Sequence, residues 1–256
     1  MEVWIEIIVC AFASLGAGLG TGFAGMSAAA VISPMLITFL GVPAYQAIGI
    51  ALASDVIASA VSAYVYGKNK KLDIKNGLLL LASVLFFTSI GSVVSSHVGN
   101  TGLGLFSVFM TFVVGIQFLL NPYPGKLRFQ NLQGAKRLLL TLASGAVIGF
   151  ICGFVGAGGG MMMLIVLTVV LGYELKTAVG TSVFVMAFTA LTGAAEHFII
   201  GGVYDWYLLG LCVILTCFFA QIASHFANRS SEVVQKRMTG GVLTALGIAM
   251  MLFTYL

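Results

Sequence analysis

Two glycine-rich turns contain the residue types that suit anion binding. They span residues 22–27 and 153–160, and we expect each to stand immediately before a short helix. The first residues of a helix leave backbone N–H groups unpaired and carry roughly half a positive charge, which favours an anion. Glycine also lets the backbone approach a ligand closely. The predicted binding residues, which include hydroxyls from a later helix, are Gly25, Met26, Ser27, Gly156, Ala157, Gly158, Gly159, Gly160, Thr181 and Ser182.

The glycines also have a packing interpretation, because several follow the GxxxG spacing that brings transmembrane helices together. These are Gly16, Gly20, Gly145, Gly149 and Gly153. We expect both roles, with packing in the upstream part of each glycine-rich stretch and anion binding in the turns themselves.

One acidic residue lies deep in an apolar segment. Asp55 is eleven residues into the segment that begins at residue 44, with Ser54 beside it. Near the bilayer centre an ionised carboxylate is costly, and such a residue is usually functional or protonated. Asp55 either binds a coupling proton or sodium ion, or makes a structural hydrogen bond between helices. A charged carboxylate would repel a bound anion, so we favour proton coupling.

Glu196 and His197 are further candidates for coupling or gating. They lie late in the apolar segment 175–200, close to the outer interface, where a polar side chain costs less to accommodate. Histidine changes its charge near neutral pH. His197 is therefore either a gate or proton relay, or an ordinary interface residue.

The elements that must position these residues are apolar helices. Hydrophobic residues make up 60% of the 256 residues, and Asp, Glu, Lys and Arg only 8%, against about 25% in a soluble domain. Apolar runs of about 18 residues or more recur along the chain, each long enough to cross a bilayer as a helix. These runs do not alternate in polarity as the strands of a membrane β-barrel do. The chain is thus expected to span the lipid bilayer several times as helices.

The remaining composition predicts neither a cofactor nor a nucleic-acid partner. The four cysteines lie in apolar stretches without CxxC or Cys/His spacing, so we expect no metal site and no disulfide. The first residues lack the basic region of a cleavable signal peptide, and we expect them to remain in the mature fold. Monomer and homodimer are both open.

Ten helical segments are predicted, and a repeat relates them. Their bounds are 3–23, 27–40, 44–66, 75–96, 101–120, 137–155, 159–171, 175–200, 205–227 and 232–254. The second and seventh are too short to span, at about 1.5 Å per residue. A shift of 131 residues places Gly18, Gly22, Gly25, Gly41 and Gly49 on Gly149, Gly153, Gly156, Gly172 and Gly180. We predict a tandem duplication with an N-terminal repeat (1–125), a cytoplasmic linker (126–136) and a C-terminal repeat (137–256).

Each repeat is expected to hold a re-entrant or broken helix pair followed by three transmembrane helices. Three full crossings are an odd number, so the repeats are predicted to be inverted. This topology puts every Lys and Arg on the cytoplasmic side, as the positive-inside rule requires, and both termini outside. The alternative, in which the first helix crosses fully and the second inserts halfway, scatters the lysines.

The paired glycine turns resemble those of the TauE/SafE sulfite exporter family, also called the toluene sulfonate uptake permease family. The resemblance covers almost the whole chain and includes Gly41-Val42-Pro43, Gly172-Tyr173-Glu174 and Ala178-x-Gly180-Thr181-Ser182. It implies transport of sulfite, sulfoacetate or a related sulfur-containing anion across a prokaryotic inner membrane.

We therefore expect an all-α polytopic membrane protein with two inverted five-segment repeats. Its expected function is secondary transport of a small sulfur-containing anion by alternating access, with a proton or sodium as coupling ion. The alternatives are an anion channel, or a transporter of another small carboxylate or inorganic ion. An enzyme is not expected, since the chain has no HExxH motif and no Walker A sequence.

Overall fold

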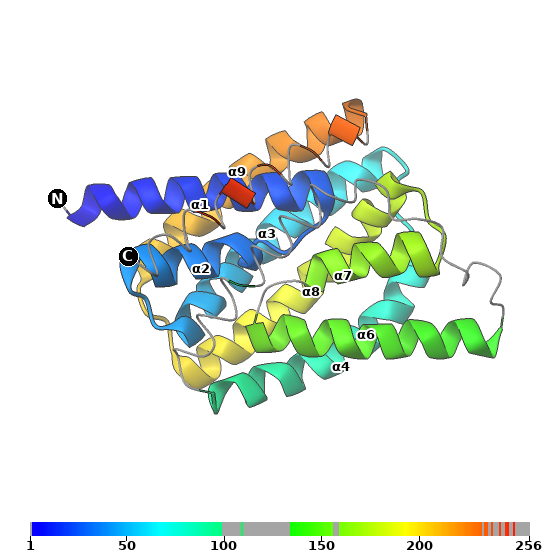
Figure 1. Cartoon of the computed structure of the whole chain (residues 1–256), viewed down its shortest axis with the longest axis horizontal. Helices are drawn as coiled ribbons and strands as arrows, with labels where there is room; N and C mark the ends of the chain where they lie inside the picture. Colours follow the sequence, from blue (N-terminus) through cyan, green and yellow to red (C-terminus); the bar gives the residue numbers. More distant parts are fainter. Residues whose placement is uncertain are drawn as a thin grey trace.

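The computed structural model describes residues 2–98, 134–155 and 159–231, with isolated positions at residue 109 and between residues 233 and 248. In this part of the chain all regular structure is helical (Figure 1). The elements are α1 (Glu2–Ala24), α2 (Ala29–Leu40), α3 (Ala44–Lys68), α4 (Ile74–Ser96), α6 (Ala135–Val155), α7 (Gly159–Ile165), the π-helical η1 (Val166–Val170), α8 (Leu175–Gly201) and α9 (Trp206–Arg229). The predicted helices at 101–120 and 232–254 lie outside the continuously described residues.

Five of these helices are long and apolar enough to cross a membrane, namely α1, α3, α4, α8 and α9. A helix of 23 residues such as α4 is about 35 Å long, which exceeds a hydrocarbon core of about 30 Å. By contrast α2 has 12 residues and reaches only about 18 Å. The chain is thus a multi-pass membrane protein, and the predicted contrast between long and short helices is confirmed.

The helix boundaries follow from local turn chemistry. Asp73 caps α4 by accepting a hydrogen bond from the Asn76 backbone N–H, and Asp205 caps α9 by accepting from Tyr207 and Leu208. At the end of α2, Gly41 adopts a left-handed conformation with φ of 64°, which a glycine tolerates without strain.

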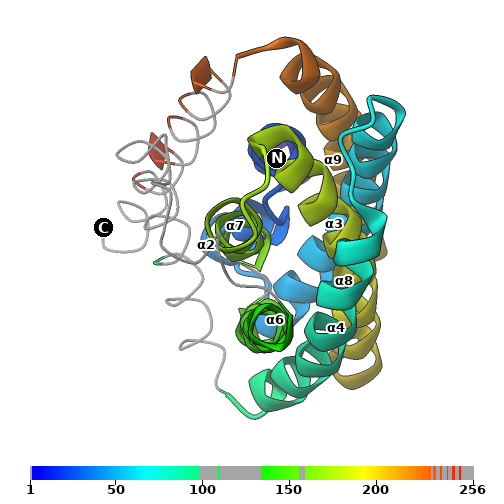
Figure 2. The ribbon, with the colours of Figure 1, turned by 90° about the vertical axis from the view of Figure 1, so that its right-hand side faces the viewer.

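The helices form two layers, which Figure 2 shows along the long axis of the bundle. Helices α4, α8, α3 and α9 lie side by side in a curved layer, and α6, α7, α2 and α1 lie beside it in a second layer. The main contacts between the layers are α1 against α9 and α6 against α4. The 131-residue shift that relates the two predicted repeats turns one of these pairs into the other. The first helix of each predicted repeat therefore packs on the last described helix of the other.

Glycines allow these two contacts to be close. A side chain at Gly149 or Gly153 would collide with the backbone of Val84 or Thr88 on α4, so α6 lies directly against that helix. On α1 a side chain at Gly18 would lie 2.5 Å from the Phe219 Cβ atom of α9. The packing role predicted for Gly149 and Gly153 is confirmed.

On α1 the close contacts involve different glycines from those predicted. Gly22, like Gly18, approaches α9, with an added Cβ atom 2.5 Å from the Ala223 Cβ atom. A Cβ atom at Gly20, in contrast, would meet only the Met26 side chain of the following turn, at 3.8 Å. The glycines of α1 that pack on α9 are therefore Gly18 and Gly22, because the fold decides which face of α1 is turned to that helix.

Charged residues separate to the two ends of the bundle. One end, here called the basic end, contains the end of α3 and the starts of α4, α6 and α8 (Figure 1). In the segments described between residues 2 and 231 it carries Lys68, Lys70, Lys71, Lys75, Lys136, Lys176 and Arg229. The opposite, acidic end carries Glu6 and Asp205 together with the exposed aromatic residues Trp4, Tyr204, Trp206 and Tyr207.

Replacement of Gly149 by leucine tests the packing of α6 on α4. We expect the Gly149→Leu protein to unfold at a lower temperature in detergent, because overpacking a tight interface costs about 1–3 kcal/mol or more. Gly210→Leu is the matched control, since nothing lies within 4 Å of a Cβ atom added there on α9. Equal melting temperatures for the two variants would contradict the packing.

Candidate functional site

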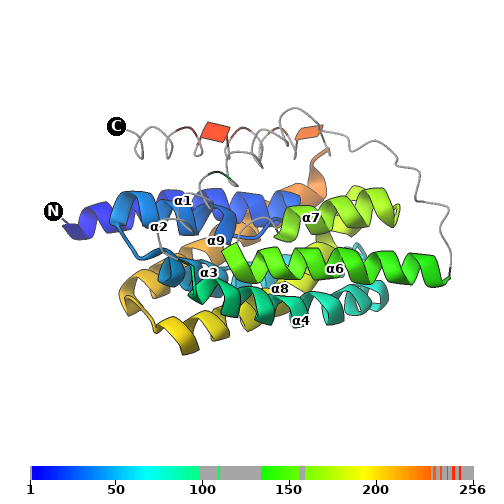
Figure 3. The ribbon, with the colours of Figure 1, turned by 60° about the horizontal axis from the view of Figure 1, so that its bottom comes forward.

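The two predicted turns lie in the interior of the bundle. Between α1 and α2 the chain reverses near the middle, and α7 runs from there in the direction opposite to α2 (Figures 1 and 3). Both short helices therefore begin in the interior and run outward to opposite ends. Three of the predicted binding residues, Gly156, Ala157 and Gly158, lie outside the described residues.

The backbones of the two turns touch each other. A Cβ atom at Gly160 would lie 2.5 Å from the Gly25 carbonyl oxygen and 2.7 Å from the Ser27 backbone nitrogen, so only glycine fits. The buried Ser182 hydroxyl of α8 lies 2.9 Å from the Gly25 carbonyl oxygen and 3.2 Å from that of Gly160. The structure thus brings together Gly25, Ser27, Gly160 and Ser182, with Met26 and Gly159 buried beside them.

The N-terminus of α2 already faces a carboxylate of the protein. Asp55 is fully buried, and its two oxygens accept hydrogen bonds from the Ser27 hydroxyl at 2.6 Å and the Ser59 hydroxyl at 2.7 Å. The Ala28 backbone N–H also donates to this carboxylate. The Ser27 hydroxyl in turn accepts from the Ala29 backbone N–H at 3.3 Å. Asp55 therefore occupies the position at which an anion was predicted to bind.

The second turn has no such carboxylate in the equivalent position. The 131-residue shift places Asp55 on Met186, whose sulfur lies 3.7 Å from a Cβ atom added at Gly159. The buried Cys152 thiol is the other near neighbour, at 3.3 Å from the same point. The two short helices thus begin in different surroundings, one beside an acid and the other beside apolar and sulfur-containing side chains.

Two predicted residues point elsewhere. Thr181, although adjacent to Ser182, accepts a hydrogen bond from the Asp73 backbone N–H at 3.0 Å, towards the basic end. Ser54, although adjacent to Asp55, donates to the Ile50 carbonyl oxygen of its own helix at 2.9 Å. The fold gives both hydroxyls partners outside the contact between the turns.

His197 lies late in α8, as the sequence indicates, but neighbouring helices bury it completely. Its side chain is fully enclosed, with Nε2 3.1 Å from the Gly153 carbonyl oxygen and Nδ1 3.0 Å from that of Tyr45. The adjacent Glu196 is partly exposed, but its Oε2 atom is buried and has no hydrogen-bond partner in the described structure. The outer part of α8 is covered because the starts of α3 and the ends of α4 and α6 pack around it.

Tyr66 is a residue that the sequence interpretation missed. Its buried hydroxyl donates to the Gly22 carbonyl oxygen at 3.0 Å. The 131-residue shift takes Tyr66 to His197 and Gly22 to Gly153, so the two repeats make the same contact with different side chains. The repeat alignment could have found this pair.

A polar cluster at the basic end joins the loop after α3 to the loop before α8. The Tyr173 hydroxyl donates to the Asp73 carboxylate at 2.5 Å, and Lys71 forms an ion pair with Glu174 at 2.9 Å. Partial burial raises the pKa of the Asp73 carboxyl, but hydrogen bonds from Tyr173 and Asn76 outweigh this and hold the pKa below its ordinary value. No sequence motif marked this cluster, because its halves lie 100 residues apart.

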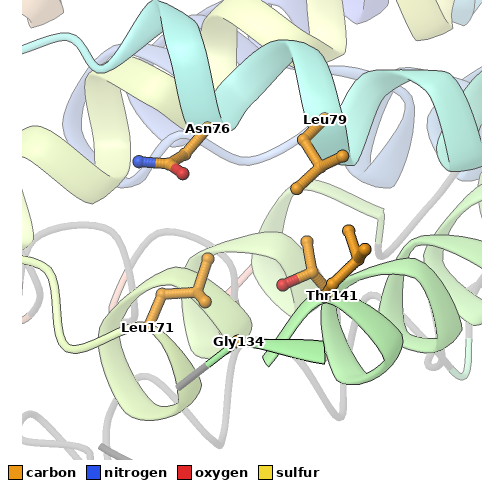
Figure 4. Close-up of a pocket in the computed structure, with 6 residues that line it drawn as sticks. Asn76, Leu79, Gly134, Thr141 and Leu171 are labelled. Carbon is orange, nitrogen blue, oxygen red and sulfur yellow. The ribbon is translucent and has the colours of Figure 1, made fainter. Parts of the chain in front are cut away.

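A pocket of about 160 Å³ also lies at the basic end (Figure 4). Asn76 and Leu79 of α4 line one side, and Thr141 of α6 with Leu171 lines the other. Its lining is mixed in polarity, and it does not reach the contact between the two turns.

Among the described residues, no group of three or more His, Cys, Asp or Glu side chains is arranged to hold a metal ion.

Comparison with known proteins finds a match to one family model and to several curated relatives. The sequence model described as "Sulfite exporter TauE/SafE" matches residues 10–250. The chain is 27% identical over 208 residues to "Probable membrane transporter protein YunE" of Bacillus subtilis (strain 168), covering 76% of each chain. It is 24% identical over 220 residues to "Probable membrane transporter protein YdhB" of the same organism, covering 86% of this chain and 89% of the relative. A "Probable membrane transporter protein" of Haemophilus influenzae is 24% identical over 208 residues, covering 80% and 79%. No solved structure gives a significant match.

Tyr173→Phe tests the polar cluster at the basic end. Because the pKa of Asp73 is lowered in the folded state, its contribution to stability is complete above about pH 4 and is lost as the pH falls through the lowered value. We expect Tyr173→Phe to destabilise the protein by about 1 kcal/mol at neutral pH, and the difference to shrink in acid. Thermal unfolding across this range is the measurement. Tyr64→Phe, at an exposed position of α3, is the control, and an equal effect there would contradict the assignment.

Proposed function

Because this chain belongs to the TauE/SafE sulfite exporter family, whose sequence model covers residues 10–250, we propose that it transports a small sulfur-containing anion by alternating access. That it is a membrane transporter follows from the family and from the names of its relatives. The proposed cargo is sulfite, sulfoacetate or another organosulfonate. The family description supports it.

The observation that carries the proposal is the meeting of two chain breaks inside the bundle. Gly25 and Ser27 of one turn touch Gly160 of the other, and Ser182 lies within hydrogen-bond distance of both. In transporters with broken helices, helix ends inside the membrane face the ligand. Here the first N–H groups of α2 are bonded to Asp55 and within the turn itself, so the anion is proposed to bind beside the contact between the turns, at the helix end that Asp55 now occupies.

An inverted repeat would give the site two alternative openings. The 131-residue glycine register, the corresponding contacts α1 on α9 and α6 on α4, and the opposite directions of α2 and α7 all support this symmetry. In such a fold, exchange of conformation between the two repeats opens the site first to one side and then to the other.

Asp55 is proposed to couple the anion to a proton. When ionised, its carboxylate already satisfies the start of α2 through Ser27 and the Ala28 N–H. A substrate anion would then meet both a negative charge and a helix end that is already occupied. Protonation removes the charge, so anion and proton would bind together. The resulting transport is symport of an anion with a proton.

The orientation proposed for the protein follows from its charged ends. The basic end would face the cytoplasm and the acidic, aromatic end the outside, with both termini external, in the inner membrane of a prokaryote.

Ser182→Ala tests the site between the turns. We expect anion affinity to fall by about tenfold, since loss of one hydrogen bond at the contact is worth roughly 1.4 kcal/mol. The measurement is the thermal shift of the purified protein with sulfite, thiosulfate, sulfate, sulfoacetate, acetate and chloride. Ser224→Ala is the matched control, because the Ser224 hydroxyl is also buried but donates to the Gln221 carbonyl oxygen within α9. If a sulfur anion raises the melting temperature of the unmodified protein, Ser182→Ala and Ser224→Ala equally, the anion binds elsewhere. If only acetate raises it, the cargo is a carboxylate and not a sulfur anion.

Asp55→Asn tests the coupling. In proteoliposomes we expect saturable sulfoacetate uptake that increases as the pH falls from about 8 to about 6, a range in which the probe keeps its charge. The neutral amide of this variant imitates the protonated acid, so its binding should lose the pH dependence and its uptake the proton coupling. Glu6→Gln serves as control. Uptake that does not saturate and ignores the proton gradient would indicate a channel.

A further inference from the structure

His197 lies between two backbone carbonyl groups that belong to other helices. Nδ1 is 3.0 Å from the Tyr45 carbonyl oxygen at the start of α3, and Nε2 is 3.1 Å from the Gly153 carbonyl oxygen near the end of α6. The Tyr45 ring stacks on the imidazole with ring centroids 4.1 Å apart. The side chain is completely enclosed, so no bulk water replaces either contact.

These two contacts require two donors on one imidazole ring. A carbonyl oxygen only accepts hydrogen bonds, whereas a neutral imidazole has one N–H and one nitrogen lone pair. In the neutral ring, one nitrogen lone pair would therefore point at an oxygen lone pair, and one carbonyl would lack its donor. The doubly protonated ring satisfies both partners. This argument does not depend on which neutral tautomer is chosen.

Three titratable groups of the described helices α3, α6 and α8 lie near His197. Glu196 is its neighbour along α8, and the buried Oε2 atom of that carboxylate has no hydrogen-bond partner in the described structure. On α3 the titratable group that faces His197 is Tyr45. Its hydroxyl donates to the Ser92 carbonyl oxygen of α4 at 3.4 Å. On α6, Cys152 precedes Gly153. Burial of the ring opposes its charge, whereas the two carbonyl oxygens and the Glu196 carboxylate favour the protonated form.

The other repeat makes the equivalent contact without a titrating donor. Tyr66, which the 131-residue shift relates to His197, donates its hydroxyl proton to the Gly22 carbonyl oxygen at 3.0 Å. The phenol keeps this proton at any physiological pH. The corresponding bond in the second repeat uses an imidazole, so only that half of the protein responds to proton concentration there.

We infer that His197 is a proton-binding residue whose protonated ring ties α8 to the start of α3 and to the broken end of α6, holding the acidic end of the bundle closed. Loss of the proton removes one of the two bonds. The Gln46 side-chain amide, which donates to the Gly201 carbonyl oxygen at 3.0 Å, is a second link between the same ends of α3 and α8. The gating role rests on the proposed alternating access, whereas the proton site does not.

Nitrogen NMR of a protein with a single histidine tests the proton site directly. The chain has three histidines, and the exposed His97 and His225 are replaced by asparagine. In detergent, ¹⁵N-labelled His197 is expected to show two protonated ring nitrogens in acid and to lose one proton as the pH rises from about 5 to about 8. One unchanged neutral tautomer across the whole range would overturn the inference.

Thermal unfolding then separates a bound proton from simple packing. We expect the two carbonyl acceptors to outweigh the cost of burying the charged ring, so that the folded state binds the proton more tightly than the unfolded chain does and the melting temperature falls by about 2–4 °C as the pH rises through the transition. A melting temperature that rises instead would show that burial dominates and would overturn the inference. His197→Gln keeps one donor and one acceptor at every pH, so it should be less stable in acid and should lack this fall. His225→Gln should retain it. An identical pH response in His197→Gln would refute the proposal, and if that variant does not fold, the NMR titration decides alone. Neither measurement needs a cargo, so failure here is distinct from failure of the transport proposal.

Discussion

The constraint on which this structure depends is that backbone polar groups inside a membrane have no water to bond. Helices α1 and α6 both end inside the bundle, and a helix end leaves carbonyl groups without intrahelical partners. Side chains from other helices satisfy them. Ser182 reaches the Gly25 and Gly160 carbonyl oxygens, and Asp55 accepts from the start of α2. Tyr66 and His197 bond to the carbonyl oxygens of Gly22 and Gly153 before the breaks.

This constraint brings structure and chemistry to the same residues. A helix that ends in the bilayer needs a buried polar partner, and a buried polar partner that titrates is sensitive to protons. Asp55 and His197 are both of this kind, and both are fully buried. The repeats use them differently, since Asp55 corresponds to Met186 and His197 to Tyr66. With the roles proposed for Asp55 and His197, each half would have a proton-dependent contact at a different place.

The two ends of the bundle are joined by different chemistry. At the basic end the Lys71–Glu174 ion pair and the Tyr173–Asp73 hydrogen bond connect loops of the two repeats near the surface. At the acidic end the connection is made by Gln46 and His197 with backbone carbonyl groups. The exposed ion pair contributes little in water. The enclosed histidine, by comparison, has no solvent to replace a lost partner, so its protonation state has more influence on the contact it makes.

Hydropathy and glycine spacing were enough to predict the long helices of the described residues and the two short ones, because each is a property of residues close together in the chain. The pairing of α1 with α9, and of α6 with α4, was not predictable in this way. Ser27 and Asp55 are 28 residues apart, and His197 and Gly153 are 44 apart. Thr181 and Ser182 show the limit most clearly, since both hydroxyls were candidates for the site. Successive helical residues point about 100° apart, so only the packing of α8 decided that Ser182 meets the turns and Thr181 meets Asp73.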